Sequence, residues 1–291
     1  MAPVSVVTDT THYLPRNVID ERGIHQVSLY VNWEGRTDRE ADFPDYDHYY
    51  ERLQINEALP TTSQPSVGDF LAVYEPLLAE GNDIVSVHLS GGISGTCASA
   101  SQARDQLIEG GLNPKRITLV DSKTAAGGLA FVVLAAAYQA SQGRRAAEVA
   151  EAAQRTSDDV KIWFAVDTLE FLRRGGRIGA ARAMVGSTLR IKPILTLERE
   201  ITPVDRVRTA ARVVDRLTGL LRERWEDGCD RWGVQHVRDP GRAQKLVENG
   251  CEIYGSEPDY ITEVGPVIGT HVGPGLLGVS AVRGESMGPR D

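Results

Sequence analysis

One stretch decides the fold class: DIVSVHLSGGISGTCASASQARDQL, residues 83–107. Residues 83–89 are rich in branched aliphatic side chains and predict a buried strand, whereas residues 97–107 have a helical pattern. Another strand is predicted at 116–120, and strand, turn, helix and strand at this spacing form a βαβ unit. The sequence therefore predicts an α/β fold with a parallel sheet.

The same alternation of strands and helices continues on both sides of this unit. On the N-terminal side we expect strands at residues 4–8 and 26–33 and helices at 46–54 and 66–79. A polar boundary at 157–159 precedes a second α/β half, for which we expect strands at 161–166, 193–197 and 201–204 and helices at 178–189 and 206–225. These patterns predict two domains, residues 1–157 and residues 158–291.

Composition excludes several classes of function. The 291 residues carry 40 acidic and 32 basic side chains, a formal net charge of -8, which argues against binding to nucleic acid or anionic membranes. Three cysteines, far apart in sequence, form no CxxC pair and fit a reducing compartment. No signal-peptide pattern is present, and the longest uncharged apolar stretch, residues 124–138, is too short to span a bilayer. We expect a cytoplasmic protein without integral membrane association.

Three segments combine small, hydroxyl-bearing and glycine residues in a way that favours binding of an anion. They are TTSQPS at 61–66, SGGISGT at 90–96 and GPVIGTHVGPG at 265–275. The second follows a predicted parallel strand, at the sheet edge where open α/β sheets bind ligands, and exposes N–H groups at a helix start. Each segment also has a structural interpretation, as a loop with a helix cap, as a tight βα turn, or as a constrained loop that carries His271.

Nucleophilic catalysis is the main alternative chemistry. The segment GISGT at 92–96 is one residue short of the GxSxG elbow, and Ser94 with His271 would suit a serine esterase or thioesterase. No GxGxxG or Walker A motif is present, and the other five histidines show no metal-ligand spacing. Cys97, just inside the helix, is interpreted as a packed small residue. A phosphotransferase subunit acting on a hydroxylated ketone rests on fold analogy alone.

Six motifs in this order resemble those of the DegV family. They are VTDTT at 7–11, TSQPS at 62–66, LSGGISGT at 89–96, VDS at 120–122, LRRGGRI at 172–178 and GTHVGPG at 269–275, so the resemblance covers essentially the whole chain. It implies a two-domain protein with an N-terminal Rossmann-like α/β/α domain, a C-terminal α/β domain and a ligand tunnel between them. The family commonly has Asp-Ser where this chain has Asp9-Thr10, and often a serine where Gly91 or Gly92 stands.

The resemblance also implies a ligand and the residues that hold it. One long-chain fatty acid, C16 or C18, would lie in an apolar tunnel, its carboxylate bound by Thr62, Ser94 and His271 with backbone amides around Gly95 assisting. The chain would then be a carrier with no catalytic residue, metal or cofactor of its own. In characterised relatives the fatty acid is presented to a separate fatty-acid kinase, which converts the carboxylate to an acyl phosphate.

Three arginines surround a predicted helix end in the second half. Arg173, Arg174 and Arg177 flank Gly175-Gly176, which would stop the helix. The charges fit a solvated helix end or a docking surface for an anionic ligand or partner, and the resemblance implies the kinase as that partner. The sequence gives no indication of the oligomeric state, for which monomer is the default expectation.

Overall fold

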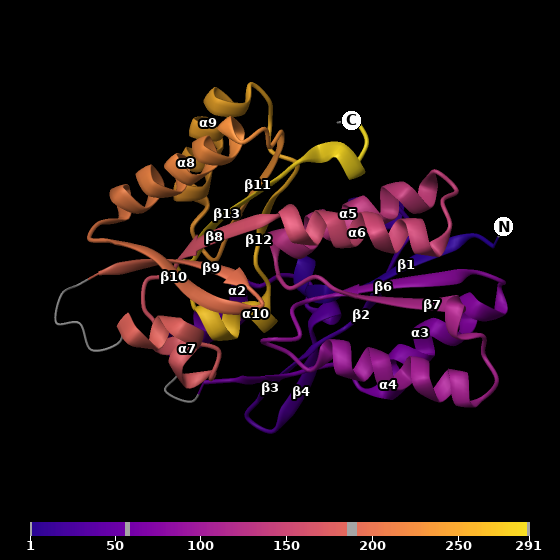
Figure 1. Ribbon diagram of the computed structural model, residues 1–291. Coiled ribbons are helices and arrows are strands. Elements are labelled where there is room, and N and C mark those ends of the chain that lie inside the picture. Colours follow the sequence, from indigo (N-terminus) through magenta and orange to yellow (C-terminus); the bar gives the residue numbers. More distant parts are fainter. Residues whose placement is uncertain (1, 56–58, 185–190, 290–291) are drawn as a thin grey trace.

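The computed structural model describes residues 2–55, 59–184 and 191–289. Figure 1 shows two large sheets with a helical layer between them and further helices on their outer faces. The predicted α/β fold with a parallel sheet is confirmed. The first sheet is formed before residue 122 and the second after residue 160, so the chain changes sheet as it leaves the helical layer.

The first sheet has four parallel strands in the order β2-β1-β6-β7. Its strands are β1 (Val4–Asp9), β2 (Ile24–Val27), β6 (Asp83–His88) and β7 (Ile117–Asp121). One face packs against α3 (Val67–Ala79) and α4 (Thr96–Glu109), and the other against α5 (Gly127–Ser141) and α6 (Ala146–Asp159). The βαβ unit predicted from residues 83–120 is therefore confirmed as β6-α4-β7.

The second sheet has six strands in the order β10-β9-β8-β13-β11-β12. They are β8 (Lys161–Ala165), β9 (Lys192–Glu198), β10 (Glu200–Val207), β11 (Arg231–His236), β12 (Ile261–Glu263) and β13 (Leu277–Val282). All neighbours are antiparallel except β11 and β12. Its outer face is covered by α8 (Ala210–Glu226) and α9 (Pro240–Tyr254), as Figure 1 shows.

Helix α5 joins the two sheets into one core. Its sequence GGLAFVVLAAAYQAS is apolar almost all round, the pattern of a helix buried on every side. It contacts β1 and β6 of the first sheet and β8, β11 and β13 of the second. The largest hydrophobic cluster accordingly includes residues from both sheets, such as Val85, Leu129 and Ile162.

A smaller unit closes one end of the molecule. The antiparallel strands β3 (Tyr30–Trp33), β4 (Arg36–Arg39) and β5 (Thr61–Ser63) form a three-stranded sheet in the order β4-β3-β5. Helix α2 (Asp47–Ile55) connects β4 to β5, and α10 (Pro266–Val272) packs against α2, β3 and β5. Two short helices, α1 (Arg16–Glu21) and α7 (Glu170–Arg174), complete the set described.

The structure corrects four sequence predictions. The strand predicted at 26–33 is two strands, because the chain leaves the parallel sheet after Val27 and enters the small sheet at Tyr30. The segment at 61–63 is strand β5 rather than loop. The helix predicted at 178–189 is a 3-10 helix over Gly179–Met184, and residues 185–190 lie outside the described residues. The helix predicted from 206 begins at Ala210, because β10 continues through Val207.

Candidate ligand-binding site

A cavity lies between the loops of the first sheet and the inner face of the second sheet. It encloses about 950 Å³ of space free of atoms, counting its open mouth. Most of its wall is apolar, and the apolar lining includes Leu89, Ile162, Phe164, Leu197, Ile201 and Val272. A lining of this kind is typical of a site for a mostly apolar small molecule.

Polar side chains gather at one part of this wall. They come from β5 and the residue after it, from the loop after β6, from the segment after α7 and from α10, and they are Thr62, Ser63, Gln64, Ser94, Arg177 and His271. Thr62 Oγ1 and His271 Nε2 are 2.8 Å apart, although 209 residues separate them in sequence. Arg177 Nε donates to the carbonyl of Ile93, next to Ser94. The structure thus brings Thr62, Ser94 and His271 to one cavity wall.

His271 lies on helix α10, not on the loop that its glycine-rich surroundings predict. Hydrogen bonds to neighbouring elements hold this helix in place. Tyr49 Oη and Thr270 Oγ1 are 2.6 Å apart, and the N–H of Val267 donates to Glu40 Oε1 at 2.8 Å. Burial raises the pKa of Glu40 to about 7, although hydrogen bonds from Thr10, Val267 and Tyr13 oppose the rise.

The His271 imidazole is neutral at physiological pH. Burial, with a smaller contribution from the Arg177 charge, lowers its pKa to about 4. Nδ1 is buried and has no hydrogen-bond partner among the residues that the structure describes. A buried N–H without an acceptor is costly, so the proton belongs on Nε2, where Thr62 Oγ1 or a ligand oxygen can accept it. His271 therefore presents a neutral donor to the cavity.

The loop after β6 is held by close backbone packing. Ser90 Oγ donates to the Arg199 carbonyl at 2.8 Å, and a Cβ at Gly92 would overlap the same carbonyl. Ser94 Oγ accepts from the N–H of Thr96 at 3.3 Å, at the start of α4. Gly95 is absent from the cavity lining, and a Cβ there would be 2.6 Å from Gln64 Nε2. Its glycine therefore allows Gln64 to pack against the loop.

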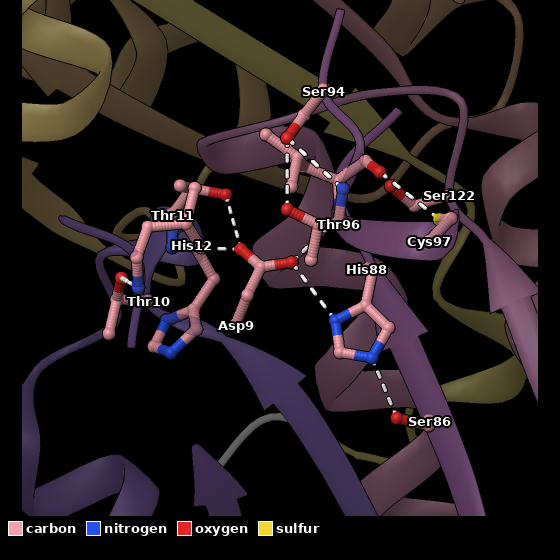
Figure 2. Close-up of polar contacts among 12 residues, drawn as sticks. Asp9, Thr10, Thr11, His12, Ser86, His88, Ser94, Thr96, Cys97 and Ser122 are labelled. Carbon is pink, nitrogen blue, oxygen red and sulfur yellow. Dashed lines mark hydrogen bonds and ion pairs between the residues drawn. The ribbon is translucent and has the colours of Figure 1, made fainter. Parts of the chain in front are cut away.

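A buried series of hydrogen-bonded side chains lies behind this loop. It includes Asp9 and His88, which sequence reasoning did not identify as a pair. Asp9 Oδ2 accepts from the N–H of Leu89 at 2.9 Å and lies 3.1 Å from His88 Nδ1 (Figure 2). The chain continues from His88 Nε2 to Ser86 Oγ at 2.7 Å, and Tyr74 Oη donates to Ser86 at 2.7 Å. Burial alone would raise the pKa of Asp9, but hydrogen bonds and charge from His88 lower it.

This Ser–His–Asp chain is a structural support and not a catalytic triad. Ser86, His88 and Asp9 are 0%, 1% and 0% exposed, so no substrate reaches them. Its effect is to tie the end of β1 to the end of β6, where the loop with Ser94 begins. A sequence signal existed, since Asp9 follows a predicted strand, but the 79-residue separation from His88 hid the pairing.

The predicted hydrolase arrangement is not assembled. Ser94 Oγ pairs with Thr96 Oγ1 at 2.9 Å, whereas His271 Nε2 pairs with Thr62. No carboxylate in the described part of the chain accepts from His271 Nδ1. An activated serine requires both a base within hydrogen-bond reach and a group that orients that base. Cys97 is equally unsuited, since burial raises the pKa of its thiol to about 12.

The structure separates the three arginines that the sequence groups together. Arg173 and Arg174 are exposed on α7 and lie near Glu170. Arg177 instead lines the cavity and donates to the carbonyls of Ile93 and Gly175. The sequence did not reveal this difference, because all three residues flank the same helix end.

Comparison with known proteins gives this arrangement a family context. Residues 3–284 match the family model described as "Uncharacterised protein, DegV family". The chain belongs to the DegV family. A DegV domain-containing protein of Streptomyces coelicolor is 38% identical, over 95% of this chain and 97% of that protein.

Solved DegV structures share the fold. A DegV family protein from Thermus thermophilus, described by its fatty acid binding, superimposes with a TM-score of 0.86 and 33% identity, covering 97% of this chain and 99% of that one. DegV of Bacillus subtilis, described as a fatty acid binding protein, also gives 0.86 and 33%, covering 97% and 100%. Within the described part of this DegV protein, no group of three or more His, Cys, Asp or Glu could hold a metal ion. None of its described helices is long and apolar enough to cross a bilayer.

Proposed function

We propose that this DegV protein binds one long-chain fatty acid, with the carboxylate at Thr62, Ser94 and His271 and the tail in the apolar cavity. One observation carries the proposal: a neutral histidine donor paired with a threonine hydroxyl lies in the wall of an otherwise apolar cavity. The fatty acid binding described for the Thermus and Bacillus relatives supports it. Arg177, in the same wall, supplies the positive charge that balances the carboxylate.

The energetics favour such a ligand. A palmitate tail has about 14 methylenes, and burying each contributes roughly 0.8 kcal/mol, about 11 kcal/mol in total. Loss of translation and ordering of the chain subtract several kcal/mol, which leaves tight non-covalent binding. The tail therefore supplies most of the affinity. The polar groups orient the carboxylate.

The test is direct binding to protein from which lipid has been removed. Thr62→Val, Ser94→Ala and His271→Ala should each weaken palmitate binding by about 1–3 kcal/mol, the cost of losing one hydrogen-bond partner in a desolvated site. An esterase would instead hydrolyse p-nitrophenyl esters and react with a fluorophosphonate at Ser94. If the protein hydrolysed these esters and the Ser94→Ala variant did not, the carrier function would be rejected in favour of an esterase.

The finer part of the proposal is that the protein presents the bound fatty acid to a fatty-acid kinase in the cytoplasm. Arg173 and Arg174 are on the exposed surface of α7, and the Gly175 that ends this helix packs against His271. A partner at this surface would therefore be near the carboxylate. Reversing both arginines to Glu should preserve palmitate binding and reduce acyl-phosphate formation by the cognate kinase. Unchanged acyl-phosphate formation would exclude this surface.

A further inference from the structure

A second polar cluster, on strands of the second sheet, lines the same cavity. Gln235 on β11 and Ser280 on β13 are only 6% and 3% exposed, and both contribute to the cavity wall. Ser280 Oγ and Gln235 Oε1 both lie close to Gly127. A Cβ built on Gly127, at the start of α5, would be 2.7 Å from Ser280 Oγ and 3.2 Å from Gln235 Oε1. Their hydrogen-bond partners differ from those at the carboxylate site: Thr62 pairs with His271, whereas Gln235 pairs with Thr262 and Ser280 with Tyr260.

The hydrogen bonds of Ser280 leave its oxygen available only as an acceptor. Tyr260 Oη donates to the carbonyl of Gly127 at 2.8 Å, which uses its single proton. The 2.5 Å contact between Tyr260 and Ser280 must then be donated by Ser280. Ser280 Oγ, which lines the cavity, can therefore still accept a hydrogen bond but has no proton to offer.

Gln235 is oriented in the same way. Its Nε2 lies 3.4 Å from the carbonyl oxygen of His12, which can only accept, and 2.9 Å from Thr262 Oγ1. Both contacts place the amide nitrogen away from Gly127 and the amide oxygen toward it. No donor in the described part of the chain reaches Gln235 Oε1. Two acceptor oxygens thus meet in a wall that is otherwise mostly apolar.

An unsubstituted acyl chain leaves these oxygens desolvated without a donor, which is unfavourable. A hydroxyl group supplies the missing proton. We propose, building on the fatty-acid function above, that Gln235 and Ser280 bind a hydroxyl group carried by the acyl chain, so that the ligand class includes hydroxylated long-chain fatty acids. The carboxylate site holds one end of the molecule, and this cluster recognises a hydroxyl along its tail.

The experiment is a competition between two ligands for lipid-free protein, measured by native mass spectrometry. One ligand is hexadecanoate, and the other is a hexadecanoate that carries one hydroxyl group, tested in turn at each of carbons 8 to 16. The quantity measured is the ratio of hydroxylated to unsubstituted ligand bound. Wild type should favour at least one hydroxylated isomer over hexadecanoate. In Ser280→Ala and Gln235→Met the ratio for that isomer should fall about tenfold, the factor that corresponds to 1.4 kcal/mol. Phe164→Leu, which changes the apolar wall only, should leave the ratio unchanged even if both ligands bind less tightly.

Two results would overturn the proposal. The first is a ratio that favours hexadecanoate for every isomer, or that is the same in wild type and both variants. The second is a crystal structure of the hexadecanoate complex in which a bound water bridges Gln235 Oε1 and Ser280 Oγ and no isomer is favoured. Ser280→Ala keeps the Tyr260–Gly127 bond and should fold, and the ratio is read only on folded protein. Hexadecanoate uptake by wild type tests the fatty-acid function separately, so the two failures are distinguishable.

Discussion

Gly175→Ala tests how the structure positions His271. Gly175 ends α7 with φ −75° and ψ −6°, a conformation that alanine adopts without strain. An added Cβ would nevertheless be 3.0 Å from His271 Cε1 and would overlap Nδ1. Restoring a contact of ordinary length requires the imidazole to move by about 1 Å, since carbon contacts are optimal at 3.5–4.0 Å. A shift of that size would break the 2.8 Å hydrogen bond between His271 and Thr62.

The expected effect is weaker fatty-acid binding in a folded protein. Loss of one oriented hydrogen-bond partner corresponds to about 1–3 kcal/mol. The assay is isothermal titration of lipid-free protein with palmitate. Gly241→Ala is the matched control, because a Cβ at Gly241 has nothing within 4 Å and its backbone is also helical. In a His271→Ala background, Gly175→Ala should cause no further loss, as expected of two residues that act through one contact. Wild-type affinity in the single variant, or additive losses in the double variant, would refute the reasoning.

Other predictions follow from the buried titratable groups. Fatty-acid affinity should change by less than about twofold between pH 6 and 8, because His271, whose pKa is about 4, stays neutral over that range; a tenfold weakening by pH 8 in a palmitate titration would show that an imidazolium is needed. Glu40→Gln should gain stability relative to wild type as pH rises from 4.5 to 7, by up to about 3 kcal/mol, because the folded-state pKa of about 7 makes wild type lose stability there. Urea unfolding at pH 5 and pH 8 measures the difference in free energy of unfolding between the variant and wild type. A difference that does not change with pH would contradict a raised pKa for the buried Glu40 carboxyl group.

Local pattern was enough to predict the parallel sheet and the cavity-facing loop. Residues 83–107 contain a strand, a small-residue turn and a helix, all of which are set by near neighbours in sequence. The break between β2 and β3 was not predictable in this way, because the alternation continues through Ser28 and Leu29 without a glycine or proline. Which sheet each half joins depends on contacts made elsewhere in the fold.

The site shows the same limit. Glycines around His271 predicted a loop, yet Gly269 lies within helix α10, where a Cβ would overlap the hydroxyl of Tyr50. This glycine is required for close packing and not for a turn. Pairings such as Thr62 with His271, or Asp9 with His88, join residues that only the finished fold brings together. The family resemblance supplied both residues of the first pair as an expectation. For the second pair only Asp9 carried a signal, as the residue that follows a predicted strand, and nothing linked it to His88.

The most direct test of the central claim is mass spectrometry of protein purified without added lipid, once under native conditions and once after organic extraction. The account predicts a stoichiometric mass increment that extracts as a single C16 or C18 fatty acid, or as its hydroxylated form. A bare protein that also fails to take up added palmitate or oleate would contradict it.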